Sequence, residues 1–517
     1  MNFGKKSEPK RGFGDSPKLG KLQSSAEEKK APKKKGLCPV AHRCGGCQYL
    51  DMPYPEQLQM KQSQMQKLLG NYCKVHGIKG MNDPFHYRNK VHAVFGYRKG
   101  EAISGVYEEK THNIVPVETC MIEDQKADEI IGTIRGMLKS FKIRTYDEDT
   151  GYGLLRHVLV RRGFTSGQIM VVLVTASPVF PSKNNFVKAL RQKHPEITTI
   201  VQNINNRGTS MVLGDKEHVL YGKGYIEDEL CGCKFRISPK SFYQVNPVQT
   251  EYLYGKAIEL AGLTGNERVL DAYCGIGTIG IIAASKAKEV IGVELNADAV
   301  RDAVQNAKCN DVKNIRFYCN DATEFMMQMA ASGDTVDVVL MDPPRAGSTE
   351  AFIKAVAAVK AKTVIYVSCG PDTLARDLGV FKKMGYQADG AWPVDMFPET
   401  GHVETVVLLS HKKPDSYIHI DVEFGEGEGK IPVDKIVQRA EQYKPKERVT
   451  YKRIKEYILE KYGFKVHTAY IAEVKRSLGL PMYDAPNAVE KLKQARKHPT
   501  PEKVEAIKDA LHYFAVI

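Results

Sequence analysis

The chain has 517 residues and a net charge of +14, with 26% charged and 42% hydrophobic residues, a composition typical of a large globular protein of about three or four domains. No apolar run reaches the roughly 18 residues of a membrane-spanning helix, and the basic start lacks the apolar stretch of a secretory signal. Eleven cysteines without such a signal favour reduced thiols or metal ligands over a disulfide scaffold. We therefore expect a cytoplasmic protein without a membrane partner and, by default, a monomer.

Residues 1–36 form a predicted disordered basic tail, because they are rich in Lys, Ser, Gly and Pro and poor in large apolar side chains. They carry eleven Lys and Arg residues against four Asp and Glu, which is half of the net charge. A positive excess favours a polyanionic partner such as RNA. A solvated segment that only keeps the protein in solution is the plainer interpretation.

Residues 37–240 have the pattern of an α+β domain. Residues 54–70 show the spacing of an amphipathic helix, and the segments after them resemble antiparallel strands joined by Gly- and Asn-containing turns. Basic side chains recur along these strands, where a period of two can collect them on one face for contact with RNA phosphates. A solvated sheet face explains any single one of them nearly as well. They are Arg88, Lys90, Arg98, Arg156, Arg161 and Arg162.

Four cysteines of this domain have the pattern of a metal site. Cys38, Cys44 and Cys47 stand as C-x5-C-x2-C, and Cys120 follows much later in the chain. Four thiolates can hold a [4Fe–4S] cluster or a zinc ion. Zinc sites usually combine two tight pairs, whereas the fourth ligand here is isolated. A closed structural cluster is therefore favoured, and the sequence alone does not separate it from zinc.

Residues 241–413 alternate strand and helix patterns, which predicts a doubly wound α/β sheet. Four consecutive strands each end in an acid or an acidic motif, at Asp271, Glu294, Asp321 and Asp342. The turn D-x-x-C-G-x-G-T lacks the third glycine of a dinucleotide fingerprint and the GK[ST] of a phosphate loop. Glu294 is placed to accept both hydroxyls of a ribose. Together these features favour S-adenosylmethionine as the ligand.

A thiol and a carboxylate follow the later strands. Cys369 ends a short buried strand just ahead of a helix start, whose partial positive charge favours a thiolate, although a buried structural cysteine fits the segment equally well. Arg345 in DPPR stands where amino-directed methyltransferases need an aromatic residue. A thiolate that adds at C6 of a pyrimidine makes C5 nucleophilic, and a base must then remove the C5 proton. Glu404, among valines that would raise its pKa, is the candidate base, and a surface charge at a strand edge is the alternative.

Residues 414–517 begin with the flexible linker FGEGEGKIP and continue as a predicted small helical accessory module. No catalytic motif is present there. An accessory role in RNA binding is one interpretation of this module.

These motifs together resemble the family of RNA uracil-5-methyltransferases, and most closely its iron–sulfur branch, which acts on 23S rRNA. The matching stretches, within residues 37–411, are CPVAHRCGGCQ with Cys120, SFYQVN, DAYCGIGT, GVELN, MDPPRAG, YVSCGPDTLARDL and HVETV. The resemblance implies a Rossmann-like class I S-adenosylmethionine-dependent methyltransferase domain preceded by an α+β iron–sulfur and RNA-binding domain. It also implies that the target uridine leaves its stack to reach the thiolate.

The resemblance assigns roles position by position. The family's nucleophile falls on Cys369 and its general base on Glu404. Its S-adenosylmethionine contacts fall on Gln244, Tyr273, Thr278, Glu294, Asp321 and Asp342, and its cluster ligands on Cys38, Cys44, Cys47 and Cys120. The family's usual amino-terminal β-barrel is replaced here by the basic tail, and the carboxyl-terminal module is additional.

Three other functions stay open at this point. Methylation of uridine in tRNA would use the same mechanism. A cytosine-5 methyltransferase would share the thiolate, but Ser368, where the DNA enzymes have a proline, precedes Cys369. A non-catalytic RNA-binding assembly factor with a structural cluster would not need the acids at the strand ends.

Overall fold

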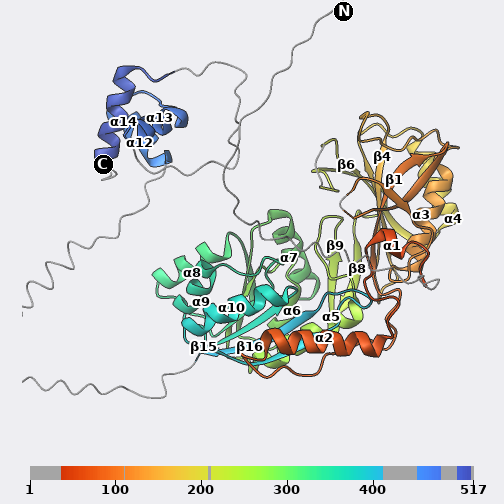
Figure 1. The fold of residues 1–517 in the computed structure, drawn as a ribbon, viewed down its shortest axis with the longest axis horizontal. Coiled ribbons are helices and arrows are strands. Elements are labelled where there is room, and N and C mark those ends of the chain that lie inside the picture. The colour runs from red at the N-terminus through yellow and green to blue at the C-terminus, as the bar shows by residue number, and fades with distance from the viewer. Residues whose placement is uncertain (1–36, 110, 208–210, 412–450, 479–497, 514–517) are drawn as a thin grey trace, which may run out of the picture. The chain divides into compact units, whose positions relative to one another are not determined.

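The computed structural model describes residues 37–109, 111–207, 211–411, 451–478 and 498–513 (Figure 1). Its contacts divide the chain into one unit of residues 1–417 and a second of residues 418–517. The predicted disordered tail and the predicted linker lie outside the described residues. Among those described, no helix is both long and apolar enough to cross a membrane.

The first sheet of the larger unit has seven strands. All neighbouring strands are antiparallel except β5 and β6, which run parallel because α4 (Lys183–Lys193) crosses over between them. The expectation of a purely antiparallel set is therefore wrong at this pair. Helices α3 (Gln125–Met137) and α4 pack on one face. The strands in spatial order are β3 (Ile114–Pro116), β2 (Glu101–Tyr107), β1 (Lys90–Arg98), β4 (Leu155–Arg162), β5 (Ile169–Thr175), β6 (Ile197–Ile204) and β7 (Lys216–Tyr221).

The second sheet also has seven strands, and its first five are parallel. The strand order reverses between β10 and β13, and open α/β sheets bind their ligands beyond the carboxyl ends of the strands at such a point. β16 is antiparallel to both of its neighbours. The spatial order is β12 (Ile315–Cys319), β11 (Glu289–Glu294), β10 (Arg268–Ala272), β13 (Val338–Met341), β14 (Thr363–Ser368), β16 (Glu404–His411) and β15 (Tyr386–Val394).

Helices cover both faces of the second sheet, so its inner strands, such as β13 and β14, are buried on both sides and read as continuous apolar runs. Successive residues such as Val269 and Leu270 enter different hydrophobic clusters. The predicted doubly wound α/β fold is confirmed. One face carries α5 (Pro247–Ala261), α6 (Thr278–Ala284) and α7 (Ala297–Cys309), and the other carries α8 (Ala322–Ala331), α9 (Glu350–Ala358) and α10 (Pro371–Lys383).

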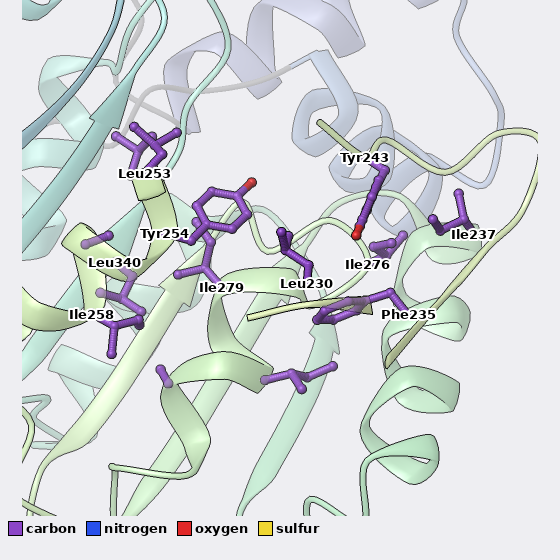
Figure 2. Packing of buried hydrophobic residues seen from close by; sticks show 14 of the residues in the cluster. Leu230, Phe235, Ile237, Tyr243, Leu253, Tyr254, Ile258, Ile276, Ile279 and Leu340 are labelled. Atoms are coloured by element: carbon purple, nitrogen blue, oxygen red, sulfur yellow. The ribbon is translucent and has the colours of Figure 1, made fainter. Parts of the chain in front are cut away.

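A hairpin of β8 (Ile226–Leu230) and β9 (Cys233–Ile237) connects the two sheets through one hydrophobic cluster. Figure 2 shows Phe235 and Tyr243 beside Ile276, on the side of the second sheet that α5 and α6 cover. The same cluster includes Met170 of the first sheet. The segment after β9, which holds the predicted cofactor residue Gln244, is therefore fixed between the sheets.

Helix α2 (Tyr54–Leu69) confirms the amphipathic helix predicted at residues 54–70. Its buried Met65 and Leu69 join the cluster on the second sheet, and Figure 1 shows α2 running beside β15 and β16. This sequence-distant contact attaches the amino-terminal segment to the second sheet. The domain boundary at residue 240 stays a prediction, and α2 packs across it.

The smaller unit contains three described helices, α12 (Tyr451–Tyr462), α13 (Thr468–Ser477) and α14 (Pro501–Tyr513), in keeping with the predicted helical module. Their apolar faces form one core, in which Ile458, Ile471, Ile507 and Leu511 are buried. The spacing of Ile454 and Ile458, four residues apart, gives α12 the apolar stripe that this packing needs.

Candidate active site

The register of two strands brings Cys369 and Glu404 to the same edge of the second sheet. In the antiparallel pair of β14 and β16, Ser368 lies opposite Thr405. The next position outward on each strand is Cys369 on one side and Glu404 on the other. A thiol and a carboxylate that are 35 residues apart in sequence therefore flank the carboxyl end of β14.

The Cys369 thiol is half-buried, and its pKa is raised to about 11. Burial is the largest cause, followed by the carboxylates of Glu404 and Asp342, while the Arg345 guanidinium acts in the opposite direction. The helix start predicted to favour a thiolate is present, because α10 begins directly after Gly370. Burial and the two acids nevertheless raise the pKa of the thiol above its usual value.

The Glu404 carboxylate is almost completely buried, and its Oε2 has no hydrogen-bond partner. Burial, with a further contribution from Asp342, raises its pKa to about 8, while Arg345 lowers it. A carboxylate with this pKa accepts a proton readily near neutral pH. An unpartnered oxygen at this position is also available to a substrate proton.

The DPPR loop after β13 is fixed to α10 through Asp377. The buried Asp377 carboxylate accepts hydrogen bonds from the Tyr366 hydroxyl at 2.7 Å and from the Ser348 backbone N–H at 2.7 Å. Thr373 donates its hydroxyl to the Arg345 carbonyl at 3.1 Å. The loop that bears Asp342 and Arg345 is thereby held against the helix that follows Cys369.

The glycine-rich turn after β10 has the conformation that an approaching ligand needs. Gly275 has φ +55° with open space where a Cβ would lie, whereas a Cβ on Gly277, at φ +81°, would meet the Phe317 ring at 2.8 Å. Tyr273 also has a positive φ of 63°, unusual for a residue with a side chain. Its ring stacks on Phe352 at 5.1 Å between centroids.

Acids at the first strand ends stabilise this turn. Asp271 is buried and accepts the Gly280 N–H at 2.8 Å, and burial raises its pKa to about 8. Glu294 accepts the Gly275 N–H at 3.1 Å through one oxygen and the Asn296 N–H at 2.8 Å through the other. The predicted ribose acceptor is therefore fixed against the glycine-rich turn.

The remaining predicted cofactor residues differ in placement. Thr278 is buried as the first residue of α6. Asp321 is exposed, and its Oδ1 caps α8 by accepting the N–H groups of Thr323 and Glu324 at 2.9 and 3.0 Å. Asp321 thus has a structural role that explains its place at the end of β12.

Asp342, Gln244 and Glu404 share a neighbour that the sequence did not single out, Tyr254 of α5. The buried Tyr254 hydroxyl is hydrogen-bonded with Gln244, and burial, then the Asp342 and Glu404 charges, raise its pKa. Burial alone raises the pKa of the half-buried Asp342 to about 7. Tyr254 was missed because it occupies an apolar position of a helix, as Figure 2 shows.

The four predicted cluster cysteines are all partly buried, and three of them, Cys38, Cys44 and Cys47, lie close enough to interact electrostatically. After burial, the charges of Cys44 and Cys38 raise the pKa of Cys47 to about 12. Cys120 shares a neighbour with this group, because the Glu123 charge raises the pKa of both Cys44 and Cys120. Within the described residues, however, no group of three or more His, Cys, Asp or Glu side chains is arranged to hold a metal ion. Cluster binding therefore stays a prediction.

Known proteins resemble the chain over most of its length. A family model described as tRNA (uracil-5-)-methyltransferase matches residues 53–412. An uncharacterized RNA methyltransferase of Halalkalibacterium halodurans is 43% identical over 408 residues, which cover 78% of this chain and 88% of that protein. One from Clostridium acetobutylicum is 42% identical over 398 residues, 76% of this chain and 86% of that protein.

A solved structure agrees with these sequences. The Pyrococcus abyssi tRNA (uracil-54, C5)-methyltransferase, in complex with S-adenosyl-L-homocysteine, superposes with a TM-score of 0.58 at 28% identity. The similarity covers 69% of this chain and 83% of that one. The chain therefore belongs to the tRNA (uracil-5-)-methyltransferase family, and it is an S-adenosylmethionine-dependent RNA uracil-5-methyltransferase.

Proposed function

We propose that this protein methylates C5 of a uridine in 23S rRNA, with Cys369 as the nucleophile and Glu404 as the general base. The observation that carries this assignment is the register of β14 and β16, which sets the two residues opposite each other at the ligand-binding edge of the sheet. Burial of Glu404 and its unpartnered Oε2 support its role as a proton acceptor.

In the proposed reaction, the Cys369 thiolate forms a bond to C6 of the uracil, and the electron pair of the C5–C6 double bond moves toward C5. When bound, S-adenosylmethionine would supply the methyl group to C5, with cleavage of its methyl–sulfur bond and release of S-adenosylhomocysteine. The Glu404 carboxylate then accepts the C5 proton. The released electron pair restores the C5–C6 double bond, and the bond from C6 to sulfur breaks, which returns the thiolate.

The residues that would hold the cofactor fit this chemistry. The open space beside Gly275 leaves room for a ligand against the backbone, and Glu294 borders it. Gln244 and Asp342 approach from the side of Glu404. Thr278, Tyr273 and Asp321 complete the proposed set, with Asp321 at the outer rim because it is exposed.

We further propose that Cys38, Cys44, Cys47 and Cys120 hold a structural [4Fe–4S] cluster. The observation behind this proposal is the electrostatic interaction among Cys38, Cys44 and Cys47, and four thiols are a donor set that suits either a cluster or zinc. Protein purified without oxygen is assayed for iron, acid-labile sulfide and zinc. Iron and sulfide that are lost in Cys120→Ser but retained in the control Cys73→Ser support the cluster. Stoichiometric zinc without iron would instead identify the site as a zinc site.

Two observations bear on which RNA is the substrate. The cysteine set resembles the branch that acts on 23S rRNA, whereas the solved relative acts on tRNA. Uridine in tRNA is therefore the second candidate.

Release of tritium from C5-labelled uridine tests the chemistry directly. Unmodified 23S rRNA and unmodified tRNA are incubated separately with S-adenosylmethionine and either the wild type, Cys369→Ala or the control Cys319→Ala, at an exposed cysteine. Release by the wild type and by the control, and none by Cys369→Ala, is the expected result. Tritium release from tRNA alone would support the mechanism but identify tRNA as the substrate. No tritium release from either RNA would contradict uridine methylation.

A further inference from the structure

Residues 395–403, which we call the base loop, connect β15 to β16 and deliver Glu404 to the site. The loop contains Glu399 at a positive φ of 67°, a backbone conformation that a residue with a side chain adopts at a cost. Tyr87 fixes one point of it by donating its hydroxyl to the Pro398 carbonyl at 3.0 Å. The loop is also hydrogen-bonded to Gln57 of α2 and to Gln48 beside Cys47, both of which lie more than 300 residues earlier in the chain.

Gln57 of α2 holds the centre of the base loop. Its amide nitrogen donates to the Glu399 carboxylate at 2.9 Å, and its amide oxygen accepts the Glu399 backbone N–H at 3.2 Å. Gln57 is completely buried and Glu399 is 3% exposed. One amide thus fixes both the backbone and the side chain of the residue with the unusual φ.

Gln48, which directly follows Cys47, holds the end of the base loop. Its amide oxygen accepts the Gly401 N–H at 3.1 Å, and its amide nitrogen donates to the Gly45 carbonyl at 2.8 Å. Its backbone N–H donates to the Glu399 carbonyl at 2.9 Å. Gln48 therefore joins the turn between Cys44 and Cys47 to a residue three positions before Glu404.

We propose that Gln48 and Gln57 are positioning residues for Glu404, and that Gln48 links the conformation of the cysteine segment to the base. This inference rests on the proposed function of Glu404 and adds the means by which its place is fixed. Neither glutamine touches Cys369 in any described contact. Their effect must therefore reach the chemistry through the backbone of the base loop.

The position of the base affects one step of the reaction selectively. Attack by Cys369 and methyl uptake precede removal of the C5 proton, so a displaced Glu404 leaves a methylated uracil bonded to Cys369. A displacement of about 1 Å at a catalytic group can lower the rate about 100-fold. A protein–RNA adduct that survives denaturing electrophoresis is consequently a specific sign of a misplaced base, which general destabilisation does not produce.

The experiment compares glutamines of one region. Gln48→Ala and Gln57→Ala are assayed for turnover and for the denaturation-resistant adduct, on the RNA that the wild type methylates. Gln62→Ala is the matched control, because Gln62 also forms a two-way amide contact from α2, donating to the His76 carbonyl at 3.1 Å and accepting the Ile78 N–H at 2.7 Å, but forms no described hydrogen bond to the base loop. Gln48→Glu keeps the acceptor for Gly401 and serves as the conservative variant.

We expect kcat to fall about 10- to 100-fold in both alanine variants, with KM for RNA within about twofold and with adduct accumulating. Gln62→Ala should release product like the wild type, and Gln48→Glu, which keeps the Gly401 contact but loses the donor to Gly45, should lose less turnover than Gln48→Ala. Because Gln48 is exposed, its variants should fold, and they test the inference even if Gln57→Ala, at a buried position, does not fold. Normal release by Gln48→Ala, or equal adduct in Gln62→Ala, overturns the inference. Absence of wild-type turnover instead overturns the proposed function.

Discussion

Cys369 and Cys47 are both partly buried thiols with raised pKa values, about 11 and about 12, but their neighbours differ. After burial, the charges that act most on Cys369 are two carboxylates and an arginine. Those that act most on Cys47 are two further thiols, followed by the Glu399 carboxylate and the Arg88 guanidinium. A thiol beside a base and a cation can attack and be released, whereas a thiol among thiols is placed for ligation. The chemistry of a cysteine thus follows from its partners more than from its pKa.

The largest effect should come from replacing the attacking thiol. Cys369→Ala removes the proposed nucleophile, without which C5 is not activated, so we expect turnover to fall by about 10⁴-fold or more. Binding of S-adenosylmethionine, measured by calorimetry, should stay within about twofold, because no described contact places Cys369 against the glycine-rich turn. Cys47→Ser, by contrast, should leave measurable turnover. Equal loss in both variants would contradict the distinction between the two thiols.

Replacing the base should have the next largest effect. Glu404→Gln keeps the shape of the side chain but cannot take the C5 proton, and general-base catalysis contributes about 10²- to 10⁴-fold. We expect the methylated protein–RNA adduct to accumulate, detected as a band of retarded mobility after denaturation. Tritium release without any adduct would assign the proton transfer to another group.

Local sequence patterns mark the candidate site residues, whereas they do not mark the contacts that support them. Cys369, Glu404 and the acids of the strand ends stand in local patterns of strand, turn and helix, which period and spacing reveal. The contact of Gln57 with Glu399 joins residues 342 positions apart, and no local pattern marks it. Tyr254 was hidden for a different reason, because a buried tyrosine on an apolar helix face looks like any core residue.

The crossover of α4 shows the same limit in the first sheet. Ile169–Thr175 and Ile197–Ile204 are apolar runs of a kind found in parallel and antiparallel pairs alike. Only the helix between them, Lys183–Lys193, decides that the pair is parallel. The apolar pattern therefore predicted that the two strands exist. Their relative direction depended on α4, which lies outside both strands.

A buried ion pair behind the base loop should affect stability. Lys61 of α2 donates to Asp395 at 2.6 Å, and both side chains are at most 1% exposed. Lys61→Met leaves the Asp395 carboxylate buried without its cation, which costs about 3–5 kcal/mol. Urea-induced unfolding of the larger unit, monitored by tryptophan fluorescence, measures this loss of unfolding free energy. Lys67→Met, at an exposed position of the same helix, should change stability by no more than about 0.5 kcal/mol.

The sign of the pH dependence sharpens this test. Burial raises the pKa of Asp395 above its unfolded value, and removing Lys61 raises it further. A carboxyl with a raised folded pKa destabilises the fold as pH rises above its unfolded pKa. The penalty of Lys61→Met should therefore be smaller at about pH 5 than at about pH 8. A penalty independent of pH would show that lost packing, not charge, is its cause.

Arg345 should have the smallest effect, because it is exposed and acts only through its charge. It lowers the pKa values of both Cys369 and Glu404, which remain raised to about 11 and about 8. In the proposed mechanism both groups react in their deprotonated forms, so wild-type kcat/KM should rise with pH to about 8 as Glu404 loses its proton, and further toward pH 11 as Cys369 does. Arg345→Met removes the cation, raises both pKa values and moves this rise to higher pH, with a loss of about tenfold near pH 7 that shrinks as pH increases. An equal loss at every pH would instead mark Arg345 as an RNA contact.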